Sequence, residues 1–363
     1  MNNKLKIAII VRSTINKVVG GDSQQVVNTA NELSKLGVHV DIILANEKID
    51  YSKYDLLHLF NIIRPADHLI HIAKSKVPTV LSTIYLDYSR FDNHGRFGLQ
   101  KKLFKIVGKD GAEFLKNNYR FFKKQDRLVS IEYLLGHRRA VKKIVSQAKL
   151  LLPNSRSEYS RLVSDYNISK PYHIVPNGIN KQLFSTIPKV ARIDNKVVCV
   201  GQIYGLKNQI GLIKAASLLN VDLTIIGKPP PNHTKYYNYC RKIASSKVKF
   251  HDFMVQEKLL EHCASSKVHA LPSWFETTGL SSLEAGAMGC NLVVGSGGDT
   301  HDYFDGYASF CVADSISSIK AALETELNKP SDKNFRDIIL DRYTWEKAAK
   351  ETLIAYNKAL NIE

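Results

Sequence analysis

Short apolar runs rich in Val and Ile alternate with segments of helical periodicity along nearly the whole chain. Runs of this kind suit strands buried on both faces, whereas apolar residues at three-to-four spacing form one face of a helix. The predicted strands of the first half are Lys6–Val11, Val38–Leu44, Leu56–Phe60, Thr79–Ile84 and Leu150–Pro153. Those of the second half are Val197–Val200, Leu223–Ile226, Val248–Phe250, Val268–Leu271 and Leu292–Val294. The predicted helices between them include Ser23–Leu36, Gln209–Leu219, Glu257–Ala264 and Ser281–Met288. The pattern predicts an α/β protein with two doubly wound sheets.

The length of 363 residues agrees with two domains, because one domain takes about 150 residues. Pro and Asn-Gly interrupt the pattern at Val175–Asn180, and a new strand-and-turn pattern follows from Asn195. Thr344–Leu360 has apolar residues at helical spacing and must therefore pack on another element. We predict two Rossmann-like domains with a cleft, at residues 1–175 and 176–343, and a C-terminal helix at residues 344–363.

Positive charge is concentrated in one part of the chain. The sequence has 51 Lys and Arg against 34 Asp and Glu, a formal net charge of +17. Residues 90–150 contain 16 Lys and Arg but 5 Asp and Glu, an excess of 11. Such an excess indicates an acidic partner, which could be nucleic acid, a phosphorylated ligand or an anionic membrane surface.

Residues 97–147 interrupt the α/β alternation with a basic, helical insertion in the first domain. One interpretation is a set of core helices whose lysines form a solvated face. The other is an interfacial surface that attracts anionic lipid headgroups and places aromatic rings at the acyl boundary. Both interpretations use the same apolar residues: Phe97, Leu99, Leu103, Phe104, Phe114, Leu115, Phe121 and Phe122.

Several protein classes lack support in the sequence. The composition, 44% hydrophobic and 23% charged, excludes a disordered chain. The longest uncharged stretch, Ala285–Gly298, has 14 residues, whereas a transmembrane helix needs about 20. Met1–Val11 is followed by Arg12 and is typical of a first strand rather than a signal peptide. The five cysteines have no metal-site spacing and suit a reducing cytosol.

Two glycine-containing loops follow predicted strands. The loop that ends in Gly20-Gly21 leads into a helix at Ser23, whose N-terminus could face an anion. The alternative is a plain turn capped by Asp22 or Ser23. In the second loop, from Gly201, Lys207 stands where a helix begins and could grip a diphosphate, although an exposed lysine is usually only solvated. Neither loop has the G-x-G-x-x-G or Walker A pattern, so a nicotinamide or ATP site loses its main support.

The segment Leu271–Gly289 is the most informative one. Glu276 lies in a loop after a strand, Gly279 frees the backbone at the turn, and Glu284 lies on the following helix. Carboxylates at this spacing are natural acceptors for the vicinal hydroxyls of a ribose or hexose. The alternative, two ordinary surface glutamates, fits poorly, because the small residues around Glu284 predict tight packing, and burying an unpaired carboxylate is costly.

Taken together, these segments resemble the retaining GT-B glycosyltransferases of family 4, the group 1 sugar transferases of polysaccharide synthesis. The resemblance covers nearly the whole chain and is most specific at Glu276-x7-Glu284. It implies two Rossmann-like domains around a central cleft, with the C-terminal helix returning to the N-terminal domain. It also implies a metal-independent reaction without a cofactor, and no Asp-x-Asp motif stands in a plausible loop. Its other motifs are Gly20-Gly21, Val175–Asn180, Gly201 to Asn208 and Leu223–Gly227.

The resemblance implies a role for each matching residue. Glu276 would hold hydroxyls of the donor sugar, Glu284 the nucleoside ribose and Lys207 the diphosphate. The backbone around Gly279 would meet the phosphates, and Gly21 would close on the donor phosphate or the acceptor. The family's usual arginine is replaced by Gln202, which cannot form a bidentate phosphate pair, so Lys228 could contribute instead. The implied donor-binding residues are Gly21, Gln202, Lys207, Asn208, Lys228, Glu276, Thr278, Gly279, Leu280 and Glu284.

The catalytic residues implied by the resemblance are Glu276, Lys207 and Asp87. Where the family often has a histidine near the reacting sugar, this chain has Ser82–Tyr88, while His58 and Asn61 follow an earlier strand. Asp87 could be an acceptor-side polar group or a base, or it could have a structural role.

The expected activity is transfer of a sugar, with retention, from a nucleotide-diphosphate sugar to a saccharide acceptor. The basic first domain suggests a lipid-linked acceptor in O-antigen or capsule synthesis and an enzyme attached peripherally to the inner face of the cytoplasmic membrane. A non-catalytic GT-B binding protein is the alternative. A nucleic-acid-binding protein is disfavoured because no zinc-finger, helix-turn-helix or RNA-recognition signature accompanies the charge.

Overall fold

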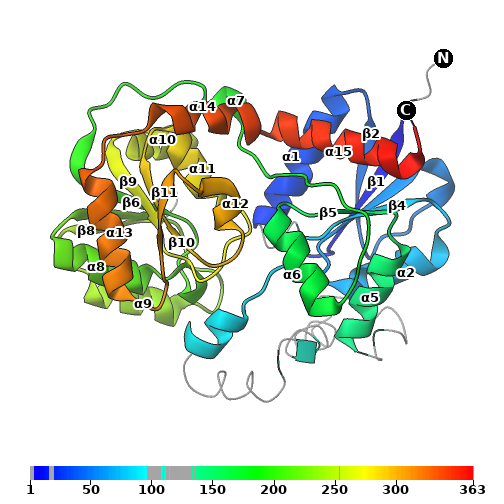
Figure 1. Cartoon of the computed structure of the whole chain (residues 1–363), viewed down its shortest axis with the longest axis horizontal. Coiled ribbons are helices and arrows are strands. Elements are labelled where there is room, and N and C mark those ends of the chain that lie inside the picture. Colours follow the sequence, from blue (N-terminus) through cyan, green and yellow to red (C-terminus); the bar gives the residue numbers. More distant parts are fainter. Residues whose placement is uncertain are drawn as a thin grey trace. The chain divides into compact units, whose positions relative to one another are not determined.

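The computed structural model describes residues 4–15, 20–95, 108, 110–111, 114, 133, 136–252 and 254–362. The described residues divide into two compact units (Figure 1). Unit 1 contains those within Met1–Leu86, Lys102–Asn177 and Trp345–Glu363, and unit 2 those within Asp87–Lys101 and Gly178–Thr344. The domain boundaries predicted after residues 175 and 343 lie within two residues of the boundaries between the units. The prediction of one continuous domain over residues 1–175 differs from the structure, because residues 87–95 group with unit 2.

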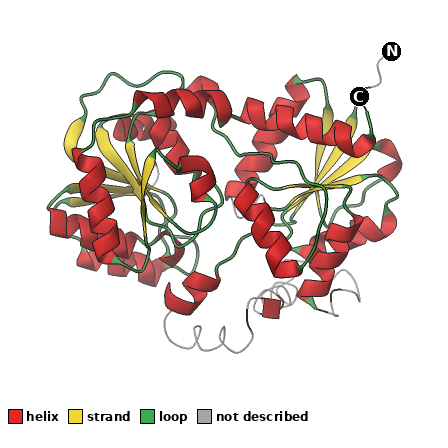
Figure 2. Cartoon of the chain, viewed as in Figure 1, coloured by secondary structure: helices red, strands yellow, loops and turns green. Residues whose placement is uncertain are grey.

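The described residues of unit 1 form one five-stranded parallel sheet of order β2-β1-β3-β4-β5. Its strands are β1 (Lys6–Val11), β2 (His39–Leu44), β3 (Leu56–Phe60), β4 (Thr79–Ser82) and β5 (Leu150–Leu152). Its helices are α1 (Gly21–Lys35), the 3-10 turn η1 (Tyr51–Lys53), α2 (Pro65–Lys74), α5 (His137–Gln147), α6 (Arg156–Tyr166) and α15 (Trp345–Leu360). Helices cover both faces of the sheet (Figure 2).

The described residues of unit 2 form a six-stranded parallel sheet of order β11-β10-β9-β6-β7-β8. Its strands are β6 (Ile193–Val200), β7 (Asp222–Ile226), β8 (Val248–His251), β9 (Ser266–Leu271), β10 (Asn291–Gly295) and β11 (Ala308–Cys311). Its helices are the π-helical turn η2 (Phe91–Gly95), α7 (Lys181–Phe184), the 3-10 turn η3 (Gly205–Lys207), α8 (Gln209–Leu219), α9 (Thr234–Ile243), α10 (Gln256–Ala264), α11 (Leu280–Ala287), α12 (Thr300–Phe304), α13 (Ile316–Asn328) and α14 (Lys333–Arg342). The predicted fold class, with two parallel sheets flanked by helices, is confirmed.

Three strands differ most from the sequence prediction. Strand β6 begins at Ile193 rather than at Val197. Strand β11 was not predicted, because its four residues at the sheet edge are mostly half-buried and lack a run of Val and Ile. Strand β4 ends at Ser82 rather than at Ile84. The buried Glu158 carboxylate accepts hydrogen bonds from the Thr83 hydroxyl and, at 2.9 Å, from the Tyr85 N–H, which draws the chain away from the sheet ladder.

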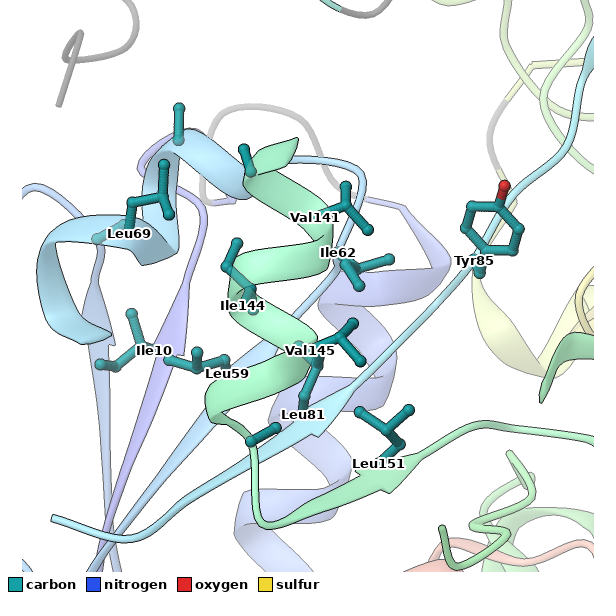
Figure 3. Packing of buried hydrophobic residues seen from close by; sticks show 14 of the residues in the cluster. Ile10, Leu59, Ile62, Leu69, Leu81, Tyr85, Val141, Ile144, Val145 and Leu151 are labelled. Atoms are coloured by element: carbon teal, nitrogen blue, oxygen red, sulfur yellow. The ribbon is translucent and has the colours of Figure 1, made fainter. Parts of the chain in front are cut away.

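The basic insertion can be examined at α5. Val141, Ile144 and Val145 are buried, and Figure 3 shows Ile144 and Val145 beside Leu59 and Leu81 of the sheet. The exposed positions of the same helix carry Arg138, Arg139 and Lys142. For α5, the apolar face therefore packs in the core, as expected for a core helix, and the basic residues are exposed. Phe114 stacks on Tyr133, with 5.4 Å between ring centroids. The other aromatic residues named for the insertion, Phe97, Phe104, Phe121 and Phe122, lie outside the described residues.

The C-terminal helix α15 packs in unit 1, where its Trp345, Ala349 and Tyr356 are buried. The Tyr356 hydroxyl lies 2.7 Å from Nδ1 of His58, whose Nε2 lies 2.8 Å from the Ser82 hydroxyl. His58 thus belongs to β3 and to the core, which corrects its expected place after the strand. None of the helices built from the described residues has the length and apolar character needed to cross a bilayer.

Burial lowers the pKa of His58 to about 3, below the value near 6.5 of an exposed imidazole. Between these values the unfolded chain binds a proton that the folded one excludes, so His58 makes stability fall as the pH falls below 6.5, by up to about 1.4 kcal/mol per pH unit. We expect His58→Gln to flatten the pH dependence of unfolding between pH 6.5 and 4.5. Urea unfolding of both proteins across this range is the measurement. Buried His68 and His269, whose pKa values burial also lowers, are present in both proteins, so parallel curves would contradict the assignment to His58.

Candidate active site

The order of strands in unit 2 reverses between β6 and β9. From β6 the chain continues to β7 and β8 on one side, and from β9 it continues to β10 and β11 on the other. In open α/β sheets, ligands bind outside the carboxyl ends of the strands at such a switch point. The loops that leave β6 and β9 at this edge carry Lys207 and Glu276, respectively.

Lys207 and Glu276 form an ion pair across the switch point. Nζ of Lys207 lies 2.5 Å from Oε1 of Glu276, and their side chains are 19% and 11% exposed. Burial by itself would lower the pKa of Lys207, but the Glu276 carboxylate outweighs burial and raises it above its usual value. The lysine therefore remains a cation, and the pair presents one phosphate-binding charge and one hydroxyl acceptor side by side.

Backbone contacts hold the two loops together. The Trp274 N–H donates to the Leu206 carbonyl at 2.9 Å. The Asn208 side-chain amide donates to the carbonyls of Pro272 (3.3 Å) and Ala313 (2.7 Å), while its Oδ1 accepts from the Gly211 N–H at the start of α8. Asn208 is predicted to bind the donor sugar nucleotide. In the structure its side chain connects the neighbouring loops and caps the helix α8.

Gln202 and Lys228 lie on adjacent loops. The Gln202 side chain is exposed, and the next residue, Ile203, donates its N–H to the Lys228 carbonyl at 3.0 Å. The loops approach this closely because Gly227 has no side chain: with φ at +150°, a Cβ there would lie 2.0 Å from the Gly201 oxygen. Lys228, which is also exposed, is therefore placed beside Gln202.

Glu276 is held through its backbone by the loop that follows β10. Its N–H donates to the Gly297 carbonyl at 3.2 Å, and its carbonyl accepts from the Asp299 N–H at 2.8 Å. A Cβ on Gly298 would lie 2.0 Å from the Glu276 oxygen, so the glycine permits this approach. The loop thereby fixes the backbone from which the Glu276 carboxylate extends.

Helix α11 begins next to this loop. Thr278 is buried, and Gly279, with φ at +76°, lets the chain turn into the helix at Leu280. The N-cap residue is Gly279 itself, which has no side chain to cap the helix N-terminus, and this end of the helix carries a partial positive charge. Glu284, one turn further, is partly buried, and burial raises its pKa to about 7. The predicted segment Thr278, Gly279 and Leu280 thus leads into the helix that carries Glu284.

Two further predicted residues belong to other segments of the chain. Gly21 is the first residue of α1 in unit 1. Asp87 groups with unit 2, and its Oδ1 accepts a hydrogen bond from the Ser89 N–H at 3.0 Å. Among the described residues, no group of three or more His, Cys, Asp or Glu side chains could hold a metal ion.

Sequence reasoning missed Arg12, which follows β1 in unit 1 and is buried. Its guanidinium binds both oxygens of Asp22 at the start of α1, with Nε 2.6 Å from Oδ2. Burial would raise the pKa of Asp22, but Arg12 lowers it below its ordinary value. Asp22 was recognised only as a possible helix cap, and no spacing rule would have paired it with Arg12.

Comparisons with known proteins match most of unit 2 to one family. Residues 194–328 match the family of glycosyl transferases group 1. The MMP alpha-(1->4)-mannosyltransferase of Mycolicibacterium hassiacum is 25% identical over 60% of this chain and 56% of its own length. A protein of Campylobacter jejuni is 27% identical over 57% of this chain and 58% of its own length. Its name is N-acetylgalactosamine-N,N'-diacetylbacillosaminyl-diphospho-undecaprenol 4-alpha-N-acetylgalactosaminyltransferase. The chain thus spans a little more than half the length of these two relatives.

Solved structures match the entire fold. Sucrose-phosphate synthase from Thermosynechococcus elongatus superposes with a TM-score of 0.76 over 99% of this chain and 100% of its own, at 15% identity. Anabaena Alr3699/HepE, solved in complex with UDP and glucose, has a TM-score of 0.68 over 97% of this chain and 99% of its own, at 13% identity. The chain therefore has the GT-B fold, and its residues 194–328 match the domain of the glycosyl transferases group 1.

Proposed function

We propose that this protein is a retaining glycosyltransferase that moves a sugar from a nucleotide-diphosphate sugar to a saccharide acceptor. The observation that carries the proposal is the Lys207–Glu276 pair at the switch point of unit 2, inside the region that matches the group 1 family. The names of the relatives, which are transferases of sugars, support an enzyme of this class.

The proposed donor-binding roles follow from charge and hydrogen-bonding capacity. Lys207 and the N-terminus of α11 would offset the negative charge of the diphosphate, Glu276 would accept hydrogen bonds from the sugar, and Glu284 from the ribose. The helix N-terminus and the lysine charge are already in place, so they stabilise charge that builds on the departing diphosphate at little cost of rearrangement. Lys228, beside Gln202, would add a further positive charge.

Retention is proposed to proceed by front-face attack. The acceptor hydroxyl would attack the anomeric carbon as its bond to the diphosphate breaks, and the hydroxyl proton would pass to a departing phosphate oxygen. No carboxylate nucleophile is needed in this scheme. Asp87 is retained as an acceptor-side candidate.

The acceptor is proposed to be a lipid-linked saccharide in surface polysaccharide synthesis of the O-antigen or capsule type. The name of the Campylobacter relative includes a diphospho-undecaprenol acceptor. The excess of 11 positive charges in residues 90–150 would favour an anionic membrane surface. We place the enzyme peripherally on the cytoplasmic face of the membrane on these grounds.

Removal of either member of the ion pair should abolish most of the turnover. We expect Lys207→Ala and Glu276→Gln each to lower sugar transfer by about 100-fold or more, the scale of losing one preorganised charge-stabilising group. Turnover of radiolabelled UDP-, GDP-, ADP- and dTDP-sugars is the measurement. Lys320→Ala, which breaks an exposed ion pair with Glu324, is the control. Unchanged turnover in both site variants would refute the site, and tight donor binding without any turnover by the wild type would indicate a non-catalytic protein.

We expect Glu284 to lower the stability of the unliganded fold and to strengthen nucleotide binding. Because its pKa is about 7 when folded and near 4.5 when unfolded, its ionisation destabilises the unliganded fold fully above pH 7 and not at all below pH 4.5. Glu284→Gln should therefore stabilise the unliganded protein at pH 8 by at most about 3 kcal/mol. The gain should disappear below pH 4.5, and nucleotide binding should weaken. Urea unfolding at pH 8 and pH 4.5 measures the first effect, and lower stability of the variant at pH 8 would oppose the assignment.

Membrane attachment predicts a preference for anionic lipid. At low salt the protein should float with vesicles containing anionic lipid and not with neutral ones. The double variant Arg139→Glu and Lys142→Glu, on the exposed face of α5, should float less. The matched control reverses two exposed lysines of α9, Lys235 and Lys242. Equal flotation with both vesicle types would exclude electrostatic attachment.

A further inference from the structure

Residues 87–95, which we call the aromatic segment, follow β4 of unit 1 in the sequence but group with unit 2. The segment includes Tyr88 and the turn η2, which begins at Phe91. It packs on the loops that follow β6 and β9, the same loops that carry Lys207 and Glu276.

Phe91 contacts both loops. Its ring lies 6.0 Å from the Trp274 ring, centroid to centroid, at 61°. On the other loop, a Cβ on Gly205 would lie 2.9 Å from Cζ of Phe91. The backbone of Gly205 is not in the left-handed region, so the approach of the Phe91 ring, rather than φ, accounts for the glycine.

Tyr88 extends the same packing toward the ion pair. Its ring meets Phe275 edge to face, with 5.7 Å between centroids at 89°. Phe275 directly precedes Glu276, and both Trp274 and Phe275 are buried. The hydrogen bond from the Trp274 N–H to the Leu206 carbonyl connects Trp274 and Phe275 to the residue that precedes Lys207.

We propose that the Tyr88 and Phe91 rings of the aromatic segment support the donor site and that Phe91 is its positioning residue. By filling the space between Gly205 and Trp274, the Phe91 ring holds the two loops at the spacing that places Lys207 and Glu276 on one ligand. The inference rests on the proposed function, because it assigns the Phe91 ring a role in nucleotide binding at the same site.

The segment also offers a matched control. Arg90 forms an ion pair with Asp314 at 3.3 Å, and their side chains are 46% and 40% exposed. Exposed ion pairs of this kind contribute little to the stability of the fold. Arg90→Ala therefore alters the same segment without disturbing the aromatic contacts.

The test is a double-mutant cycle on nucleotide affinity. Binding of UDP, GDP, ADP and dTDP is measured by calorimetry for the wild type, Phe91→Ala, Gly205→Ala, the double variant and Arg90→Ala, well below each unfolding temperature. For the nucleotide that binds best, we expect Phe91→Ala to bind at least tenfold more weakly and Gly205→Ala, whose methyl group displaces the ring, at least fivefold. Because both changes act through one ring, the double variant should match Phe91→Ala within twofold. Arg90→Ala should match the wild type within twofold.

If Phe91→Ala fails to fold, Phe91→Leu, which keeps apolar volume but not the ring, takes its place with an expected loss of at least threefold. Wild-type affinity in the Phe91 variant, or losses that multiply fully in the double variant, would overturn the positioning role while leaving the proposed function intact. A wild type that binds none of the four nucleotides would overturn the proposed function and this inference with it. A merely structural role of Phe91 would lower the unfolding temperature without the shared loss of affinity.

Discussion

The candidate site depends on how closely the loops at the carboxyl edge of the unit 2 sheet approach one another. Backbone meets backbone at Gly227 against Gly201 and at Gly298 against Glu276, where any side chain would collide with a carbonyl oxygen. Parallel strands deliver all these loops to one edge of the sheet, and the reversal of strand order opens the space between them. Lys207 and Glu276 can form an ion pair because this packing brings together residues that are 69 positions apart.

The site keeps charge in a partly buried place, which is costly unless the charges are compensated. Lys207 and Glu276 compensate each other in the unliganded protein. Among the residues that the structure describes, no cation offsets the burial of Glu284 in this way, and the rise in its pKa reflects that cost. Under the proposed function, a nucleotide sugar would supply anionic phosphates to the lysine and hydroxyl donors to both carboxylates, and would so offset the cost of burying them.

Unit 1 is organised around different polar contacts. The His58 ring connects β4 to the C-terminal helix, and the Glu158 carboxylate bends the chain out of the sheet after Ser82. The chain then enters the aromatic segment, which packs in unit 2. A few buried polar groups in unit 1 therefore set the direction in which the chain leaves β4.

The sequence by itself determined the features that depend on neighbouring residues. Periodicity alone predicted two parallel α/β sheets and the C-terminal helix, because burial on both faces imposes a Val- and Ile-rich pattern within each strand. The same local pattern predicted the helix α11, which placed Glu284 on that helix and Glu276 in the loop before it. Only the tertiary structure decided which distant residues meet. Lys207 forms an ion pair with Glu276, and Arg12 forms one with Asp22. His58 lies in the core, and Asn208 caps a helix. The Phe91 ring packs against Gly205. Apart from the cap at Asn208, these contacts join residues at least 10 positions apart, and their geometry follows from packing rather than from local pattern.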